Sequence, residues 1–292
     1  MHSAKIMSLI RRYDIRPSKG LGQNFLVDEA VYDDILEASD VRASDTVLEI
    51  GPGIGILTRR LAEKAKCVVA VELDRKMISI LADVLKDYDT AHIVQGDILE
   101  IDPVAEIVQA LDKGDTGPLR YKVVANPPYY ITSALIRHLL TARVRPTQLT
   151  LMVQAEVAER IIAEPGDLNL LAVSVQYFGE PELVRRVPAS AFYPSPEVNS
   201  AILNVHVYGD KERTKKQKEA FFRIVRAGFA HRRKQIHNSL AHNLHIPHKR
   251  VINALKDAMI DPKRRPQTLK IEEWETLVES LILQDDREPP EK

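Results

Sequence analysis

The segment ANPPYY at residues 125–130 places a carboxamide, two prolines and an aromatic ring directly after the apolar run YKVV. Proline has no N–H to continue a sheet or a helix, so the strand predicted for YKVV ends here on a stiff backbone. The side-chain oxygen of Asn126 and the carbonyl of Pro127 can each accept an N–H, and Tyr129 can stack on a planar base. These groups are suited to holding and orienting a planar ligand that carries N–H donors. The alternative is an ordinary turn in which Tyr129 is a packing residue.

Three further polar features follow other predicted strands. The loop in VLEIGPGIGILT carries Gly51 and Gly53 between a strand and a helix, and its spacing differs from the dinucleotide and Walker glycine motifs. Glu72 ends the next strand, where a carboxylate can accept both hydroxyls of a ribose. Asp97 follows the third strand. Either acid alone would be read as a helix cap, but carboxyl ends of parallel strands meet at one edge, so these features predict a shared ligand site with Asn126.

A parallel sheet is needed to bring these residues together, and the sequence shows its pattern. Short apolar strands alternate with amphipathic helices, which predicts an α/β, doubly wound, Rossmann-like sheet. The predicted strands are 46–50, 67–73, 91–95, 121–125 and 147–154, and the predicted helices are 28–39, 56–65, 75–88, 103–111, 132–140 and 156–163. Two closing strands, 182–187 and 201–207, favour an antiparallel hairpin at one edge of the sheet.

The alternation of strands and helices ends near residue 209, and only helical patterns follow. They cover about 215–230, 232–243, 247–258 and 271–283. A chain of 292 residues suits one large and one small domain. We therefore expect four parts: a flexible basic leader (1–27), a catalytic domain that binds a cofactor (28–209), a basic helical domain (210–284) and a disordered tail (285–292).

Charge is unevenly distributed although the chain is neutral as a whole. Residues 211–250, the basic block, hold twelve Lys or Arg against two Glu, together with five His. Apolar positions interleave with these cations, which favours a nucleic acid partner over a merely solvated helix face. The residues predicted to bind this nucleic acid are Arg232, Arg233, Lys234, Lys249 and Arg250. We expect no metal site among the histidines, because Pro247 interrupts their spacing and no Cys or carboxylate completes a set.

Composition limits the setting of the protein. No apolar run approaches the roughly 20 residues that span a bilayer, so we expect no membrane association. The single Cys67 excludes an internal disulfide and fits a reducing compartment. These features predict a cytoplasmic protein, and we expect a monomer.

The motifs taken together resemble a known family. EIGPGIGILT, VELD, GDIL and NPPY are similar to class I methyltransferases that modify an exocyclic amino nitrogen. Adding GLGQNFLVD, MVQAEVAERI, FYPSPEVNSAI and FAHRRKQIHNSL, the chain from about residue 17 to 283 resembles the KsgA-type ribosomal RNA adenine dimethyltransferases.

This resemblance implies a cofactor, a substrate and a set of residues. The cofactor would be S-adenosylmethionine, and the substrate would be small-subunit ribosomal RNA in a pre-ribosomal particle, methylated twice on each of two adjacent adenosines near its 3′ end. The residues implied to line the cofactor site are Asn24, Leu26, Gly51, Gly53, Glu72, Asp97 and Asn126. Phe192, in FYPSP, would flank the target base, whereas the residues alone fit a core plug equally well.

Two other functions remain open from the sequence. One is a large-subunit ribosomal RNA adenine methyltransferase of the erythromycin-resistance type, which shares QNFL and the glycine loop. The other is a non-catalytic factor for ribosome assembly or transcription. The segment HRRKQIHNSL favours the small-subunit enzyme over the first, and the presence of Asn126, Tyr129, Glu72 and Asp97 argues against the second.

Overall fold

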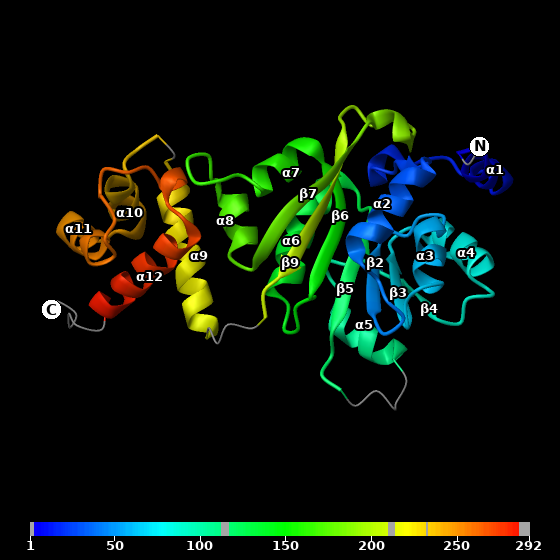
Figure 1. The fold of residues 1–292 in the computed structure, drawn as a ribbon, viewed down its shortest axis with the longest axis horizontal. Coiled ribbons are helices and arrows are strands. Elements are labelled where there is room, and N and C mark those ends of the chain that lie inside the picture. The colour runs from blue at the N-terminus through cyan, green and yellow to red at the C-terminus, as the bar shows by residue number, and fades with distance from the viewer. Residues whose placement is uncertain (1–2, 112–116, 210–213, 232, 286–292) are drawn as a thin grey trace. The chain divides into compact units, whose positions relative to one another are not determined.

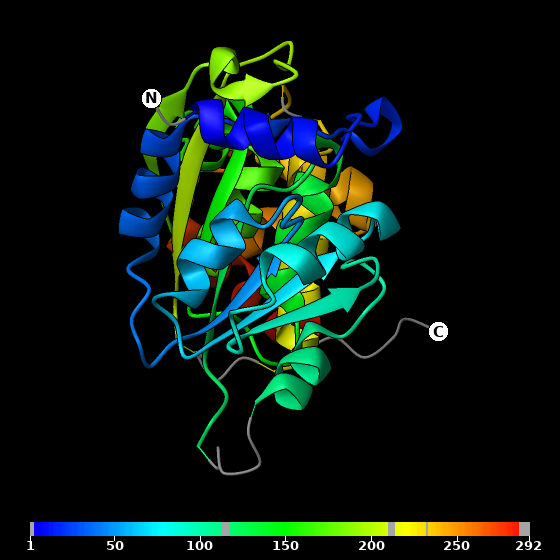
Figure 2. The same ribbon diagram turned by 90° about the vertical axis from the view of Figure 1, so that its right-hand side faces the viewer.

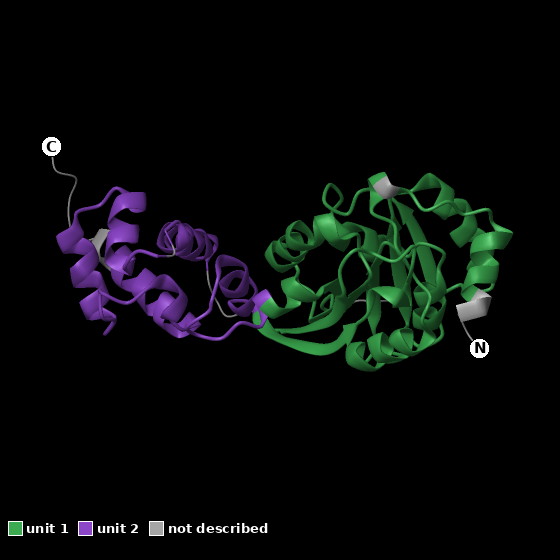
Figure 3. Ribbon diagram, turned by 90° about the horizontal axis from the view of Figure 1, so that it is seen from above, with its two compact units in different colours: residues 1–159, 179–208 green, residues 160–178, 209–292 purple. Residues whose placement is uncertain are grey.

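The computed structural model describes residues 3–111, 117–209, 214–231 and 233–285. It divides into two compact units (Figure 3). The sheet unit comprises residues 1–159 and 179–208, and the helical unit comprises residues 160–178 and 209–292. Of the predicted tail, only Asp285 belongs to the described residues.

A seven-stranded sheet forms the centre of the sheet unit. Its strands are β2 (Thr46–Ile50), β3 (Cys67–Glu72), β4 (Ala91–Gln95), β5 (Tyr121–Ala125), β6 (Gln148–Gln154), β7 (Gly179–Val187) and β9 (Ser200–Val207). They lie in the order β4-β3-β2-β5-β6-β9-β7 (Figure 1). The five strands from β4 to β6 are parallel, and β9 and β7 continue the sheet in antiparallel pairing. This confirms the doubly wound fold and its antiparallel edge hairpin.

Helices cover the sheet (Figure 2), and this is why its central strands are almost entirely apolar. They are α2 (Glu29–Ser39), α3 (Ile56–Ala62), α4 (Arg75–Val84), α5 (Pro103–Ala110), α6 (Thr132–Thr141) and α7 (Ala155–Ile161), of which α7 runs into the helical unit. Every residue of β2 and β3 is buried, as expected for parallel strands covered on both faces. Between its two buried ends, β7 alternates exposed and partly buried positions instead, which is the pattern of a strand with one face toward solvent.

The order of the strands creates a point at which the chain changes direction. From β2 the chain adds β3 and then β4 on one side, and it returns to add β5 on the other side of β2. Open α/β sheets bind ligands outside the carboxyl ends of the strands at such a point. The segments after β2 and β5 therefore occupy the favoured position for a site.

The amino-terminal segment contains two elements that were not predicted. Helix α1 (Ser3–Arg12) buries Ile6 and Ile10, while Arg11 and Arg12 are exposed. A two-stranded sheet pairs β1 (Phe25–Leu26) with β8 (Phe192–Tyr193). This pairing links the leader to a loop more than 160 residues away. The flexibility expected for residues 1–27 stays a prediction.

The helical unit is built around aromatic contacts. Its helices are α8 (Leu170–Gln176), α9 (Lys215–Phe229), α10 (Ile236–Leu244), α11 (His248–Asp257) and α12 (Ile271–Asp285). Tyr177, just after α8, stacks on Phe221 of α9 with ring centroids 4.0 Å apart. Residues 160–178, which the sequence assigns to the catalytic domain, thereby group with the helical unit.

Gly228 of α9 leaves the space that the buried Trp274 of α12 fills. A Cβ at Gly228 would lie 2.4 Å from the indole ring, and Trp274 is fully buried. The Ser239 hydroxyl on α10 donates to the carbonyls of Ala227 and Gly228, at 2.8 Å in each case. The three helices are thus held closely at one point. Within the described residues, no helix is long and apolar enough to cross a membrane.

We predict that Gly228→Ala destabilises the helical unit by about 2 kcal/mol, because the added methyl group overpacks the contact with Trp274. Trp274 is the single tryptophan of the chain, so urea unfolding followed by its fluorescence reports this unit directly. Gly209→Ala is the matched control, since a Cβ there meets nothing within 4 Å. An unchanged urea midpoint for Gly228→Ala would show that the helices can separate without cost.

Candidate functional site

The register of the sheet brings the predicted residues to one level. Ile50 of β2 pairs with Val71 of β3 and with Ala125 of β5. The next residue on each strand is therefore Gly51, Glu72 or Asn126, and these three lie side by side just beyond the last paired row. Glu72 in turn pairs with Gln95 of β4, whose chain continues to Asp97.

A cavity of about 390 Å³, the edge pocket, lies at this edge. Its volume is within the range of small-molecule sites. All the residues implied for the cofactor line it: Asn24, Leu26, Gly51, Gly53, Glu72, Asp97 and Asn126. Pro127 and Tyr129 line it as well. The structure thus brings every predicted cofactor residue, and all but one of the predicted catalytic residues, into one cavity.

The glycine loop wraps around the carboxylate of Glu72. Gly51 and Gly53 have φ of 68° and 57°, values that favour glycine over other residues. In this conformation the Gly53 N–H donates to Oε2 of Glu72 at 3.1 Å, and the Asp74 N–H donates to Oε1 at 2.8 Å. Burial raises the pKa of Glu72, and these two hydrogen bonds oppose the rise. A carboxylate has about four acceptor positions, so Glu72 can still accept hydroxyls from a ligand.

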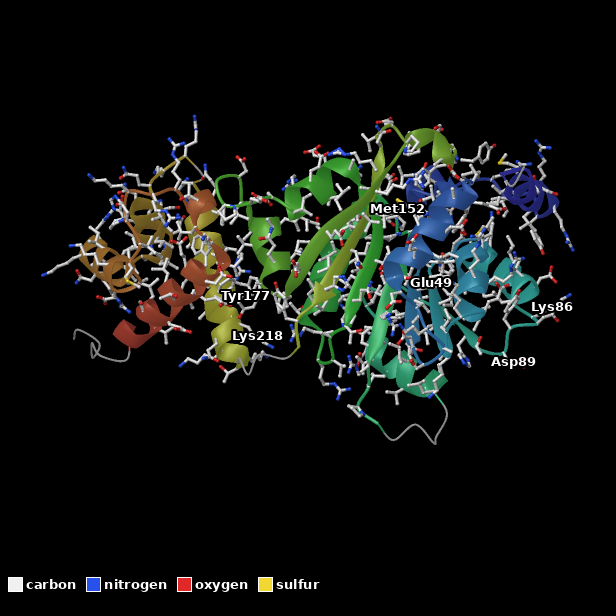
Figure 4. All side chains as sticks on the ribbon, in the orientation of Figure 1. Glu49, Lys86, Asp89, Met152, Tyr177 and Lys218 are labelled. Carbon is white, nitrogen blue, oxygen red and sulfur yellow. The ribbon has the colours of Figure 1, made fainter. Side chains whose placement is uncertain are left out.

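Glu49 is a second acid, placed in β2 immediately before the glycine loop. It is 1% exposed and lines the edge pocket, and Figure 4 shows it inside the sheet unit while Lys86 and Asp89 lie at the surface. Burial raises its pKa to about 8; the Thr58 side chain opposes the rise, and the negative charge of Glu72 adds to it. Among the described residues, Oε2 of Glu49 has no hydrogen-bond partner. A buried acceptor of this kind is suited to a cationic or N–H group of a ligand.

The proline turn after β5 forms another part of the wall of the edge pocket. A Cβ at Gly51 would lie 3.7 Å from the Asn126 carbonyl oxygen, so the turn lies against the glycine loop. Tyr129 opens a short 3-10 helix, η2 (Tyr129–Ile131), and its hydroxyl forms a hydrogen bond with the buried Ser200 hydroxyl on β9. Burial raises the pKa of Tyr129 and the bond with Ser200 opposes it, so the phenol stays neutral near pH 7. The ring is therefore a fixed, uncharged surface.

Residues 18–26, the strap, contribute the remaining wall. Leu21 to Leu26 all line the edge pocket. Asn24 donates through its side-chain nitrogen to the Gly22 carbonyl at 3.2 Å. The Tyr32 hydroxyl donates to the carbonyl of Leu26 at 3.0 Å, and the Arg60 guanidinium lies over the Tyr32 ring at 5.2 Å. Helices α2 and α3 thus support the end of the strap that enters β1.

Phe192 is the predicted residue that the structure does not bring to the edge pocket. It is 3% exposed, pairs with Leu26 in the small sheet and belongs to the hydrophobic core of the sheet unit. This placement corresponds to the core plug considered from the residues alone. Its neighbour Tyr193 is 42% exposed.

The basic residues of the helical unit differ in their surroundings. Arg233, Lys234 and Lys249 are exposed, whereas the Arg250 guanidinium donates to the Leu281 carbonyl of α12 at 3.4 Å. Arg232 lies outside the described residues. Arg264 is paired with Glu273 through both terminal nitrogens. Three of the five predicted cations thus face solvent.

Sequence reasoning missed several residues of the site. Gln23, Asp74 and Ser200 support pocket residues but were not selected. Asp74 had a local signal, since an Asp directly before a helix is a typical N-cap, and its side chain accepts from Lys76 N–H at 2.9 Å. Ser200 had none, because only the packing of β9 beside η2 brings its hydroxyl to Tyr129.

Comparison with known proteins gives a consistent result. The family model for ribosomal RNA adenine dimethylase matches residues 16–283. The chain is 43% identical over 274 residues to the ribosomal RNA small subunit methyltransferase A of Dehalococcoides mccartyi, covering 94% of this chain and 91% of the relative. It is 42% identical over 279 residues to the protein of the same name from Moorella thermoacetica, covering 95% and 96%.

Two solved structures are similar over most of the chain. A dimethyladenosine transferase from Plasmodium falciparum has a TM-score of 0.74 at 25% identity, covering 90% of this chain and 98% of that one. The 23S rRNA methyltransferase ErmE has a TM-score of 0.68 at 29% identity, covering 89% and 100%.

We predict that Glu49 makes stability fall as pH rises. Because its pKa in the folded protein, about 8, is above the ordinary value of 4.5, the folded state binds this proton more tightly than the unfolded chain. The stabilisation is complete below about pH 4.5 and is lost as pH rises to about 8. Glu49→Gln removes this titration. Between pH 5 and 8 the unfolding free energy of the wild type should therefore fall relative to that of the variant, by up to a few kcal/mol.

Urea unfolding at several pH values, followed by circular dichroism, measures this difference. Glu37→Gln is the matched control, since Glu37 is exposed on α2 and its replacement should matter little at any pH. A Glu49→Gln curve that stays parallel to that of the wild type would contradict the buried, protonated state of Glu49.

Proposed function

This chain belongs to the ribosomal RNA adenine dimethylase family and is an rRNA adenine dimethyltransferase, and from this premise we propose how its edge pocket acts. We propose that it transfers two methyl groups to the exocyclic amino nitrogen of each of two adjacent adenosines near the 3′ end of small-subunit rRNA. The family relationship supports small-subunit rRNA as the substrate.

One observation carries the proposal. The Asn126-Pro127-Pro128-Tyr129 turn shares a single cavity with the glycine loop, Glu72 and Asp97. Acceptors for an amine therefore lie beside a set of groups suited to a nucleoside. A turn that merely ended β5 would have no reason to share this cavity.

The residues present fit S-adenosylmethionine, the cofactor that the family implies. Glu72 can still accept hydrogen bonds from ribose hydroxyls, and Asp97 offers a carboxylate to an amino group. Oε2 of Glu49, which has no partner among the described residues, can accept a hydrogen bond from the amino group of the methionine moiety. Gly51 and Gly53 allow the backbone to come close. When bound, S-adenosylmethionine supplies a methyl group on a positively charged sulfur.

The turn prepares the target nitrogen. An adenine amino group is a weak nucleophile because its lone pair is delocalised into the ring. The Asn126 side-chain oxygen and the Pro127 carbonyl each accept one N–H, which favours a tetrahedral nitrogen and directs its lone pair. Positioning of this kind can lower a barrier by about 7–11 kcal/mol. The acceptors also stabilise the positive charge that develops on the nitrogen during transfer.

Tyr129 confines the base and does not act as a proton acceptor. Its pKa is raised by burial, and its hydroxyl is occupied by Ser200, so the neutral ring offers a stacking face. The base reaches it only after leaving its own stack. Phe192, buried in the core, would need to move to contact the base, so the stacking role is assigned to Tyr129 first.

The basic block supplies affinity for the RNA. Arg233, Lys234 and Lys249 are exposed cations, suited to phosphate contacts that hold a folded RNA without reading its sequence. We propose that the natural substrate is the RNA within a pre-ribosomal particle, that the protein acts as a monomer, and that it works in the cytoplasm, where small subunits are assembled.

The second candidate is methylation of large-subunit rRNA, which the similarity to ErmE raises. It is the weaker candidate, because identity is 43% to the small-subunit relative and 29% to ErmE. Transfer of labelled methyl groups to small subunits that lack the modification, with mapping of the labelled base, decides between them. Label found on large subunits alone would overturn the small-subunit assignment.

We predict that Asn126→Ala lowers kcat at least about 100-fold while binding of S-adenosylmethionine and RNA is largely kept, because an acceptor that acts during transfer is lost. Single-turnover transfer gives the rate, and calorimetry gives donor binding. Asn126→Asp is the matched variant: it keeps side-chain acceptors in nearly the same shape and should retain more activity than the alanine. Wild-type turnover in Asn126→Ala would remove Asn126 from the mechanism.

We predict that Arg233→Glu combined with Lys234→Glu weakens RNA binding and reduces its salt dependence by about two units of slope, since two phosphate contacts are lost. Filter binding at several salt concentrations measures this slope. Lys86→Glu makes the same kind of change at an exposed site on the sheet unit and should alter binding less. Equal effects of the two changes would argue against a localised RNA surface.

A further inference from the structure

We propose that Gln23 is a positioning residue that fastens the strap across the edge pocket through Asp74, and so sets how tightly the methyl donor is held. The inference rests on the proposed function, because it assigns the edge pocket to the donor. It adds a residue that touches neither the target amine nor the groups assigned above to the donor's ribose.

Both polar atoms of the Gln23 side-chain amide form hydrogen bonds. Its Oε1 accepts the Ser18 N–H at 2.9 Å, and its Nε2 donates to Oδ2 of Asp74 at 2.9 Å. The Gln23 N–H also donates to the Ser18 carbonyl at 3.2 Å. The first and last of these bonds close residues 18–23 into a compact turn, and the second ties that turn to a residue 51 positions further along the chain.

Asp74 is a rigid anchor. It is the N-cap of α4, and its Oδ1 accepts the Lys76 N–H at 2.9 Å. Its own N–H donates to Oε1 of Glu72 at 2.8 Å, and Glu72 accepts the Gly53 N–H at 3.1 Å. Gln23 therefore joins the same chain of hydrogen bonds that orients Glu72 and the glycine loop.

The strap has a second point of attachment at its other end. Phe25 and Leu26 pair with Tyr193 and Phe192 in the small sheet. Between the two attachments, Gly22 lies against the ring of Tyr130: a Cβ there would be 3.4 Å from two ring carbons. Tyr130 is 63% exposed and lines the edge pocket.

These contacts divide the strap into a firmly held part and a part that can be released. The strand pairing and the buried Phe25 and Leu26 fix the carboxyl end. Residues 21–24 are only partly buried, and Gln23 holds them to the body of the sheet unit by a hydrogen bond that water can replace. Opening here would uncover the edge pocket without unfolding the sheet, so the Gln23–Asp74 bond controls the escape of the donor.

An exchange of the two partners tests this directly. Gln23→Glu keeps an oxygen for Ser18 but places a carboxylate against that of Asp74. Adding Asp74→Asn exchanges the amide and the carboxylate, so a hydrogen bond can form in the opposite direction while the Asn oxygen still caps Lys76. Gln109→Glu is the matched control, because it makes the same charge change at an exposed position on α5.

The readouts are the Kd and dissociation rate of S-adenosylhomocysteine by calorimetry and stopped flow, and amide hydrogen exchange of residues 18–26. For Gln23→Glu we expect Kd to rise about tenfold, as a lost hydrogen bond to a charge implies, with faster exchange in the strap. KM for the donor should rise more than kcat falls. The double variant should return close to the wild-type Kd and exchange rate, with Gln109→Glu unchanged throughout.

Two results would overturn the proposal: donor binding by Gln23→Glu equal to that of the wild type, or a double variant that binds as weakly as Gln23→Glu with the strap still exchanging fast. Failure of the proposed function would look different. In that case the wild type itself would not bind S-adenosylhomocysteine or would not methylate small-subunit rRNA, whatever the variants do.

Discussion

Parallel pairing of β3, β2 and β5 is the constraint on which the rest of the site depends. It places Glu72, Gly51 and Asn126 level with one another on neighbouring strands, which are roughly 4.8 Å apart. A slip of one residue in either pairing would turn a strand's side chains to the opposite face. Such a slip is opposed by the burial of every residue of β2 and β3, so the hydrophobic core holds the polar edge in register.

Glu72 and Glu49 are two buried acids at this edge, and they differ in their hydrogen-bond partners. Glu72 is surrounded by backbone N–H donors from the glycine loop and from the start of α4, which offset its loss of water. Glu49, one row deeper, has an oxygen without a partner in the described structure and holds its proton to higher pH. Burial raises the pKa of both carboxyl groups, and two backbone N–H donors oppose the rise at Glu72, whereas the Thr58 side chain opposes it at Glu49.

The edge pocket and the exposed cations of the basic block belong to different units. The edge pocket is built entirely from the sheet unit, while the exposed cations Arg233, Lys234 and Lys249 belong to the helical unit. In the proposed function, phosphate contacts by these cations give affinity and orientation that do not depend on base identity, whereas the proline turn acts on a single amino group. A neutral total charge conceals this division, which becomes visible only when charge is counted along the chain.

The sequence by itself determined the layered α/β fold, because its strands are continuous apolar runs and its helices are amphipathic. The strands at 46–50, 91–95 and 121–125 agree residue for residue with β2, β4 and β5. It also located the polar residues that follow those strands, since strand ends are marked locally by Gly, Pro and acids.

Only the tertiary structure decided which distant segments meet. Two-residue strands such as β1 and β8 have no periodicity to detect, and the bonds from Gln23 to Asp74 and from Tyr129 to Ser200 join residues 51 and 71 positions apart. Helix α1 was overlooked because its buried Ile6 and Ile10 lie among basic residues that suggested an unstructured leader. Phe192 was placed in the core by its pairing with Leu26, a contact between distant segments that no pattern within FYPSP indicates.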